Sequence, residues 1–282
     1  MSSRKIGLHL RITSTLEDMV RSAIDLKLNL FQFFLINQSN NTYITLTAKE
    51  KLFFTRHRAR FSDLFIHSSY WINLAAAQPS VFNHSKKLLK REIAAAKTLN
   101  IPYLVIHPGS AKGHQTSTND PDGKIAGIKT TAHMLNSLLK SEYDVQILLE
   151  NTAHGKKTIG NDLEDFMYIK EELYYPEKVG FCFDTAHAFS YGYNLAPQED
   201  FIKVLDKTMG LTQIKLIHFN DTYDIQGSMQ DRHADPGSGN IGKETLQNIL
   251  NHESLRKIPT IIEAPEHSHT QHRLLLTEIT SW

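Results

Sequence analysis

The 282-residue sequence predicts an α/β protein that folds as a (β/α)8 barrel, also called a TIM barrel. Short apolar runs rich in Ile, Leu, Val and Phe recur eight times, and segments with the apolar spacing of helices lie between them. No Pro/Gly/Ser-rich linker or abrupt change of composition divides the chain, so we expect a single domain over residues 1–282. A doubly wound open sheet is the alternative, but no G-x-G-x-x-G motif follows the first apolar run.

The eight apolar runs are the expected strands of the barrel. Parallel strands in such folds are buried on both faces, which fits runs that are nearly continuous in apolar residues. The runs span residues 5–10, 28–35, 64–67, 103–107, 145–150, 179–184, 214–218 and 260–263. The segments between them combine good helix formers with helical spacing. Helices are expected at residues 15–26, 46–61, 85–100, 127–140, 161–173, 198–209 and 243–251.

Composition limits the class of protein. With 40% hydrophobic and 22% charged residues, the chain is an ordinary globular protein with ample core. A formal charge of +1 neither requires nor excludes a nucleic-acid partner, because phosphate affinity depends on local basic patches. The single cysteine, Cys182, cannot form an internal disulfide and is expected to pack in the core, which fits a reducing compartment. No apolar run approaches ~18 residues and the N-terminus lacks an apolar leader, so we expect a cytoplasmic protein with no membrane partner.

The third to eighth apolar runs all end in a residue that can bind a metal. These six residues are His67, His107, Glu150, Asp184, His218 and Glu263. In a barrel, the C-terminal ends of the strands form one rim where active sites lie, so these side chains are expected to converge. One such residue alone is more commonly a helix cap or a turn residue. Six in succession predict a metal centre.

Three more residues are expected at the same rim. His187 follows Asp184 in "DTAH" and can face the cavity from the start of the loop after the sixth strand. Asp231 and His233 lie in "MQDRHADPGSGNIG", where residues i and i+2 of an extended segment point to the same side and Arg232 points to the other. This segment has almost nothing apolar to bury. We therefore expect metal coordination to order it.

The nine candidate ligands indicate the type of metal centre. Five histidines, two aspartates and two glutamates are too many for one ion and match three. Imidazole combined with carboxylate favours zinc, then manganese or iron, over calcium or magnesium. Neighbouring metal ions can clamp the entering and leaving oxygens of a phosphoryl displacement. Hydrolysis of a phosphodiester is therefore the predicted reaction.

Seven sequence blocks resemble the signature blocks of the endonuclease IV family of apurinic/apyrimidinic (AP) endonucleases. They occur in the same order and at similar intervals: "IHSSYWINLA", "VIHPGS", "LLENTA", "FDTAHAFSYGYNL", "IHFND", "GSMQDRHADPGSGNIG" and "IIEAP". The resemblance implies a barrel of the endonuclease IV and xylose isomerase-like type that carries three zinc ions. It also implies cleavage of double-stranded DNA on the 5′ side of an abasic site, leaving a 3′-hydroxyl and a 5′-deoxyribose phosphate.

The resemblance also assigns roles to individual residues. It implies that the first zinc is held by His67, His107 and Glu150; the second by Glu150, Asp184, His218 and Glu263; and the third by His187, Asp231 and His233. Manganese or iron can replace zinc at one of these sites. Glu150 would bridge two ions, and Glu263 would orient or deprotonate the attacking hydroxide. No nucleophilic side chain is then needed, in agreement with the absence of a G-x-S-x-G motif.

Substrate recognition departs further from the family. Tyr70 matches an aromatic residue that enters the DNA at the lesion, and Arg11 is a candidate phosphate contact. Arg11 lies in "RITSTL", which replaces a Ser-x-x-Gly-Gly turn of the family. The family loop after the second strand is basic and aromatic, whereas here it is the polar "INQSNNTYITLT". These departures leave the metal ligands intact and concern the reading of the lesion.

Two other functions remain open from the sequence. Sugar isomerases and epimerases of similar barrel architecture also use Glu, Asp and His at strand ends, but they need one or two ions, which leaves His187 and "DRH" without a role. A DNA-binding module that keeps its metals and no longer cleaves is the second alternative. We expect the protein to be a monomer.

Overall fold

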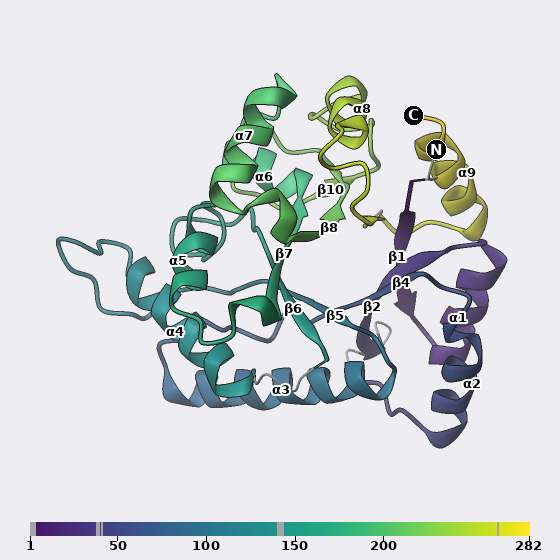
Figure 1. The fold of residues 1–282 in the computed structure, drawn as a ribbon, viewed down its shortest axis with the longest axis horizontal. Coiled ribbons are helices and arrows are strands. Elements are labelled where there is room, and N and C mark those ends of the chain that lie inside the picture. The colour runs from purple at the N-terminus through teal and green to yellow at the C-terminus, as the bar shows by residue number, and fades with distance from the viewer. Residues whose placement is uncertain (1–3, 38–39, 41, 140–143, 264) are drawn as a thin grey trace.

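The structure, a computed structural model, describes residues 4–37, 40, 42–139, 144–263 and 265–282. Within these residues, eight parallel strands form a closed barrel, because β1 pairs with both β2 and β11 (Figure 1). The strands are β1 (Ile6–Ile12), β2 (Leu30–Asn37), β4 (Asp63–His67), β5 (Tyr103–Ile106), β6 (Gln146–Glu150), β7 (Val179–Asp184), β8 (Ile214–His218) and β11 (Thr260–Ile262). The predicted (β/α)8 barrel is confirmed.

Three short strands lie outside the barrel. β3 (Thr42–Tyr43) pairs antiparallel with the end of β2, and residues 38, 39 and 41 of the predicted loop between them lie outside the described residues. β9 (Asp221–Thr222) and β10 (His233–Ala234) form an antiparallel ladder in the long segment after β8, with His233 opposite Thr222. This ladder gives the rim loop a regular backbone that its composition did not indicate.

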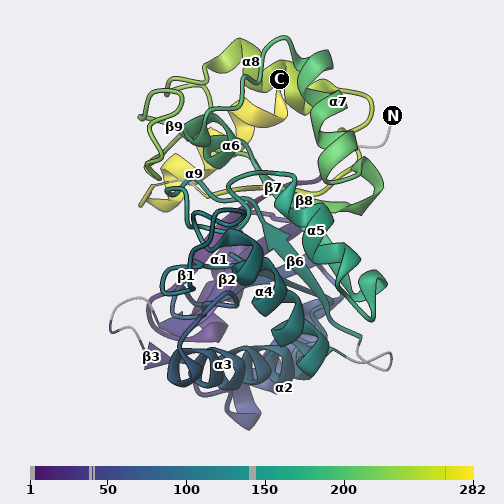
Figure 2. The same ribbon diagram turned by 90° about the vertical axis from the view of Figure 1, so that its left-hand side faces the viewer.

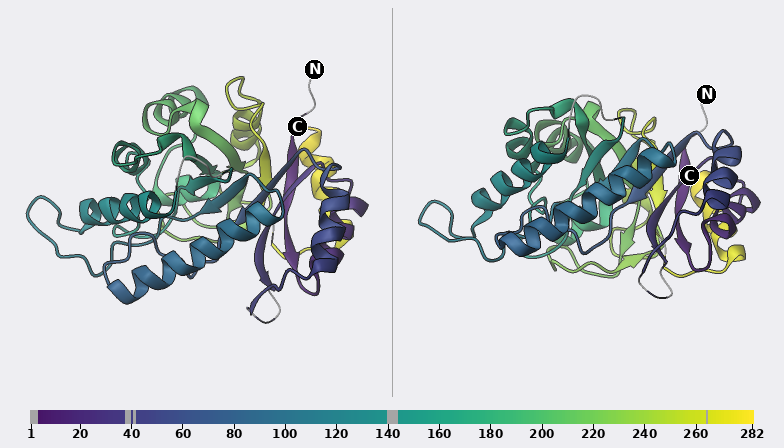
Figure 3. Two further views of the ribbon diagram at one scale, coloured as in Figure 1. Left: turned by 60° about the horizontal axis from the view of Figure 1, so that its bottom comes forward. Right: turned by 90° about the horizontal axis from the view of Figure 1, so that it is seen from below.

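Helices surround the strands (Figures 2 and 3). Seven correspond to the predicted helices: α1 (Leu16–Asp25), α2 (Ala48–Arg58), α3 (Pro79–Thr98), α4 (Lys124–Leu138), α5 (Asp165–Glu171), α7 (Gln198–Thr208) and α8 (Lys243–Asn251). Two were not among the predicted helix spans: α6 (Thr185–Tyr191) and the C-terminal α9 (His269–Thr280). Short 3-10 turns, η1 (Pro176–Lys178) and η2 (Leu211–Gln213), lead into β7 and β8. Helix α9 begins with a capping box of Ser268 and Gln271. No helix of the described chain is long and apolar enough to cross a membrane.

The barrel interior is built in layers that fix the height of the functional site. One buried apolar layer contains a residue from each of seven strands: Leu30, Phe65, Val105, Leu148, Cys182, Leu216 and Ile261. Cys182 packs here as predicted. Side chains two residues further along each strand point to the same face and form the next layer. That layer is polar: Gln32, His67, His107, Glu150, Asp184, His218 and Glu263. His9 takes the corresponding place on β1, two residues after Gly7.

Candidate metal centre

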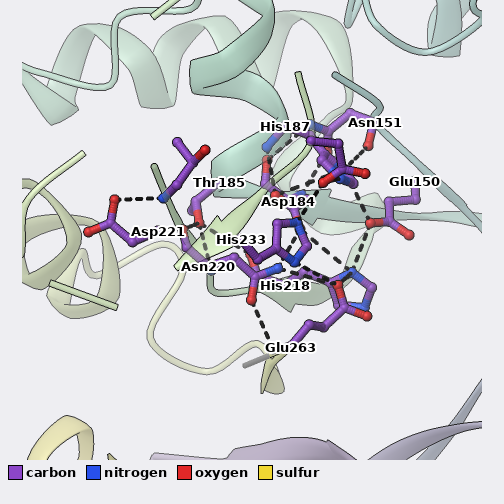
Figure 4. Close-up of polar contacts among 12 residues, drawn as sticks. Glu150, Asn151, Asp184, Thr185, His187, His218, Asn220, Asp221, His233 and Glu263 are labelled. Carbon is purple, nitrogen blue, oxygen red and sulfur yellow. Dashed lines mark hydrogen bonds and ion pairs between the residues drawn. The ribbon is translucent and has the colours of Figure 1, made fainter. Parts of the chain in front are cut away.

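The polar layer brings together the six predicted strand-end residues at the C-terminal rim of the barrel, as Figure 4 shows for four of them. The first group is His67, His107 and Glu150, whose ligand atoms all lie within 4.8 Å of one another. Nε2 of His67 and Nε2 of His107 lie 3.0 and 3.2 Å from Oε2 of Glu150. β5 ends at Ile106, so His107 is the first residue after its strand.

The second group shares Glu150 with the first and adds Asp184, His218 and Glu263. Nδ1 of His218 lies 2.8 Å from Oε1 of Glu150 and 3.3 Å from Oε2 of Glu263. Both carboxylate oxygens of Glu150 are therefore engaged, one with each group. The Glu150 side chain is fully buried, whereas that of Glu263 is 14% exposed.

The third group shares Asp184 with the second and adds His187 and His233. Asp231 approaches it from the rim loop, because its Oδ1 lies 3.2 Å from Nε2 of His187 and 3.1 Å from Nε2 of His233. Asp231 and His233 thus point to the same side, as the i, i+2 spacing predicts. Arg232 points away and pairs with Asp224.

The placement of His187 on a loop is corrected. Asp184 is the N-cap of α6, and its Oδ1 accepts the backbone N–H of His187 at 2.7 Å. His187 therefore lies in the first turn of a helix whose start is fixed by another member of the cluster. This arrangement holds the two side chains close together irrespective of any loop conformation.

The hydrogen bonds of the histidines in the third group test whether the cluster fits metal ions. Nδ1 of His187 donates to the backbone carbonyl of Asn151 at 2.8 Å, so in the neutral ring Nε2 carries the lone pair. That lone pair faces Oδ1 of Asp231. Nε2 of His187 and Nε2 of His233 are both buried and lack a hydrogen-bond partner in the described part of the chain. A metal ion held by these nitrogens and the carboxylate would satisfy all three groups.

His67 of the first group and His218 of the second follow the same pattern. Nδ1 of His67 donates to the backbone carbonyl of Ser68 at 2.9 Å, which leaves Nε2 for Glu150 and a shared ion. Nε2 of His218 lies 2.9 Å from the side-chain oxygen of Gln32, which leaves Nδ1 on the side of the carboxylates. One ring nitrogen bound to a protein oxygen and the other directed at the cluster is the usual arrangement of a metal-binding histidine. The residues present therefore fit metal ions, and histidine with carboxylate favours zinc.

The pKa values reflect how charge is balanced within the cluster. Burial raises the pKa of Glu150, but the charges and hydrogen bonds of His218 and His107 together outweigh it and hold the pKa well below its usual range. Burial lowers the pKa of His187, but Asp184, Asp231 and Glu150 together outweigh it and hold the pKa well above its usual range. Protonated imidazoles thus compensate the carboxylates when no metal is bound. Metal ions would replace those protons.

The rim loop has an anchor that does not involve a metal ion. The carboxylate of Asp221, fully buried on β9, accepts five backbone N–H groups at 2.8–3.3 Å. The donors are Thr222, Gly237, Gly239, Ile241 and Gly242. A Cβ at Gly239 would lie 2.5 Å from Oδ1 of Asp221, so glycine permits this close approach. The expectation that a metal alone orders the segment is therefore corrected.

Two clefts adjoin the cluster, and Tyr70 lines both. The first, of about 420 Å³, is lined by His9, Arg11, Phe34, Tyr70, Asp231, His233, Glu263 and Pro265. The second, of about 340 Å³, lies between the loops after β4, β5 and β6 and contains His67, His107 and His154. Tyr70 is 71% exposed, and its ring packs 5.2 Å from that of Phe34. The Arg11 side chain is 45% exposed and lies 3.5 Å from Glu266.

Three residues in contact with the cluster were not identified from the sequence. His9 and Gln32 belong to the polar layer, and Asn220 donates to Oδ2 of Asp184 at 2.7 Å. Gln32 interrupts the otherwise apolar run "LFQFF", which is a usable signal for a functional polar residue. His9 is likewise a polar residue within the first run.

Comparison with known proteins relates the chain to one family. The family model of the xylose isomerase-like TIM barrel matches residues 31–280. The probable endonuclease 4 of Thermosipho melanesiensis is 34% identical over 268 residues, which cover 93% of this chain and 92% of that protein. Endonuclease IV from Thermus thermophilus superposes with a TM-score of 0.80 at 26% identity, covering 97% of this chain and 99% of that one. A D-tagatose 3-epimerase-like protein, at 17% identity and a TM-score of 0.73 over 98% of this chain and 97% of that one, shares the fold alone.

Proposed function

Because the chain belongs to the endonuclease IV family of AP endonucleases, we propose that it is a hydrolase that cleaves DNA at abasic sites. The proposed reaction breaks the phosphodiester bond 5′ to the abasic site and leaves a 3′-hydroxyl and a 5′-deoxyribose phosphate. The proposed cofactor is three zinc ions, one of which manganese or iron can replace. The proposed substrate is double-stranded DNA that carries an abasic site, and the proposed role is DNA repair.

The convergence of nine metal-binding side chains in three overlapping groups carries this proposal. Glu150 belongs to two of the groups, as does Asp184, so neighbouring ions would be held at a fixed separation. His67 and His107 would complete the first site, His218 and Glu263 the second, and His187, Asp231 and His233 the third. All nine side chains come from one chain. A monomer is therefore sufficient for the proposed activity.

The residues of the cluster would divide the work of hydrolysis. Zinc ions, when bound, supply Lewis acidity, which activates water and neutralises charge that develops on the phosphodiester. Glu263 is the candidate to orient the attacking water and to accept its proton, because it is partly exposed and lines the first cleft. Glu150 is fully buried and is better suited to hold the ions than to meet the substrate.

Recognition of DNA is proposed for Tyr70 and Arg11. Tyr70 is a largely exposed aromatic residue at the boundary of two clefts, where its ring can stack on a base or fill the space beside an abasic sugar. Arg11 lines the first cleft and offers a guanidinium to a backbone phosphate. Neither side chain contributes a ligand atom to the cluster.

The proposal is tested by metal analysis combined with an activity comparison. We expect close to three transition-metal ions per chain and loss of DNA cleavage once they are removed by prolonged chelation, with recovery on addition of zinc. The epimerase alternative would be supported if the protein held one or two ions per chain, exchanged a proton on a ketose and did not cleave DNA. Tight binding of abasic DNA by the metal-loaded protein without cleavage would support a binding module.

A further inference from the structure

Two members of the polar layer, His9 and Gln32, are not among the nine proposed ligands. Gln32 is fully buried, and the His9 side chain is 7% exposed. A buried amide or imidazole costs free energy unless its polar atoms are hydrogen-bonded. The partners of these two side chains therefore show what they do in the barrel.

Gln32 joins two residues of the second metal group. Its Nε2 donates to Oε1 of Glu263 at 2.8 Å, and a carboxylate can only accept, so this contact fixes the orientation of the amide. Its Oε1 then accepts a hydrogen bond from Nε2 of His218 at 2.9 Å. The proton of His218 is thereby placed on Nε2, and the lone pair of Nδ1 faces the carboxylates of the cluster.

His9 continues the chain of hydrogen bonds. Its Nδ1 lies 3.1 Å from Oε1 of Glu263 and 2.9 Å from Nε2 of Gln32. Since a carboxylate can only accept, Nδ1 of His9 donates to Glu263 beside the bond from Gln32, and the neutral ring carries its proton on Nδ1. Nε2 of His9 is buried and has no hydrogen-bond partner among the residues that the structure describes. His9 lines the first cleft together with Arg11, Tyr70 and Glu263.

We propose that Gln32 and His9 are positioning residues of the metal centre. Gln32 orients His218 and Glu263, and His9 donates from Nδ1 to the same Oε1 of Glu263, so that Oε2 of Glu263 stays directed at the cluster. The inference rests on the proposed function, since it concerns the zinc ions and the reaction assigned there.

The role of Gln32 is tested by Gln32→Met, which keeps the length of the side chain and removes both hydrogen bonds. We expect one of the three zinc ions to bind about 10-fold to 100-fold more weakly, as measured by competition with a chelator, while the other two are retained. A general loss of stability would weaken all three ions. Gln146→Met is the matched control, because Gln146 lies at the opposite end of β6 and donates to the backbone carbonyl of Glu177.

The role of His9 is tested by two variants that differ in the hydrogen bond to Glu263. In His9→Asn the side-chain amide can still donate from a place close to that of Nδ1, whereas His9→Leu has no donor. The rate of single-turnover cleavage is measured with a duplex that contains one abasic-site analogue. We expect His9→Leu to keep its zinc and to cleave about 10-fold to 100-fold more slowly, and His9→Asn to cleave close to the wild-type rate.

The outcomes separate the positioning roles from the proposed function. Wild-type protein that neither binds zinc nor cleaves the duplex would overturn both. Wild-type protein that does both, together with Gln32→Met that holds three ions equally tightly, would overturn the role of Gln32 alone. His9→Leu that cleaves as fast as wild type would overturn the role of His9, and this variant decides the question should Gln32→Met fail to fold.

Discussion

The backbone N–H of Gly239 donates to the buried carboxylate of Asp221 at 3.0 Å and ties the Gly-rich end of the rim loop to β9. The same Oδ2 accepts the N–H of Gly237 at 3.0 Å and that of Gly242 at 3.3 Å. The glycines of this segment therefore lie close around one carboxylate, and Ile241 between them packs in the hydrophobic core. Order in residues 237–242 does not depend on a metal ion alone.

Because the proposed metal site and the Asp221 carboxylate would hold the rim loop independently, we expect substitutions at His233 and at Asp221 to have different effects. His233→Ala is expected to lose about one metal ion per chain while residues 237–242 stay ordered. Asp221→Asn is expected to lower the free energy of unfolding by about 1–3 kcal/mol, because an amide N–H2 would replace one acceptor oxygen among five N–H groups. Metal content, urea unfolding and protease cleavage within 229–242 are measured on both. A His233→Ala protein that is cleaved rapidly in the tail would show that the metal is the dominant anchor.

Glu263→Gln is expected to reduce the rate of the chemical step by at least ~10², because the amide keeps the size of the side chain and removes the base beside the water. Single-turnover cleavage of a labelled abasic duplex measures this rate. Glu253→Gln serves as control, since the side chain of Glu253 is 89% exposed and pairs with Arg256. Near-normal turnover in the Glu263 variant would remove Glu263 from the mechanism.

Tyr70→Ala is expected to reduce the preference for abasic over intact duplex while metal content stays the same. The reason is that the ring lines both clefts and contributes no ligand atom to the cluster. Competition binding with the two duplexes measures the preference. Tyr223→Ala is the control, because Tyr223 is also an exposed tyrosine of the rim, at 57%, and lines neither cleft. Equal loss in both variants would argue against a specific role for Tyr70.

The metal-free protein is expected to be most stable between about pH 4.5 and 6.5. The folded-state pKa of Glu150 is lowered because His218 and His107 together outweigh the effect of burial, so the stability that Glu150 contributes is lost as pH falls through that pKa. The folded-state pKa of His187 is raised because Asp184, Asp231 and Glu150 together outweigh burial. The stability that protonated His187 contributes is fully present below the pKa of the unfolded state and is lost as pH rises through the pKa of the folded state. Urea midpoints of chelator-treated protein from pH 4 to 9 test this, and a midpoint that rises steadily above pH 7 would contradict it.

The sequence predicted the strand-end residues because most of those strands stop at the polar layer. His67, Glu150, Asp184 and His218 are the last residues of their strands, so each closes an apolar run. The strands β1 and β2 continue past this layer to Ile12 and Asn37, which places His9 and Gln32 inside longer runs. Their membership becomes evident only when the layers of neighbouring strands are aligned in space.

The remaining differences come from contacts that are distant in sequence or locally ambiguous. Asp221 reaches residues up to Gly242, and nothing in "IHFND" distinguishes its carboxylate from that of a surface residue. Helix α6 has only seven residues, too few for a clear apolar period, and depends on the side-chain cap of Asp184. The backbone of the rim loop is set by pairing of β9 with β10, which its polar composition conceals.

The most direct test is incubation of zinc-loaded protein with a 5′-labelled duplex that contains a single tetrahydrofuran abasic-site analogue. We expect one nick on the 5′ side of the analogue, with a 3′-hydroxyl that a DNA polymerase can extend and no cleavage of the matched intact duplex. Protein that carries close to three metal ions and leaves the abasic duplex uncut would contradict the proposed function.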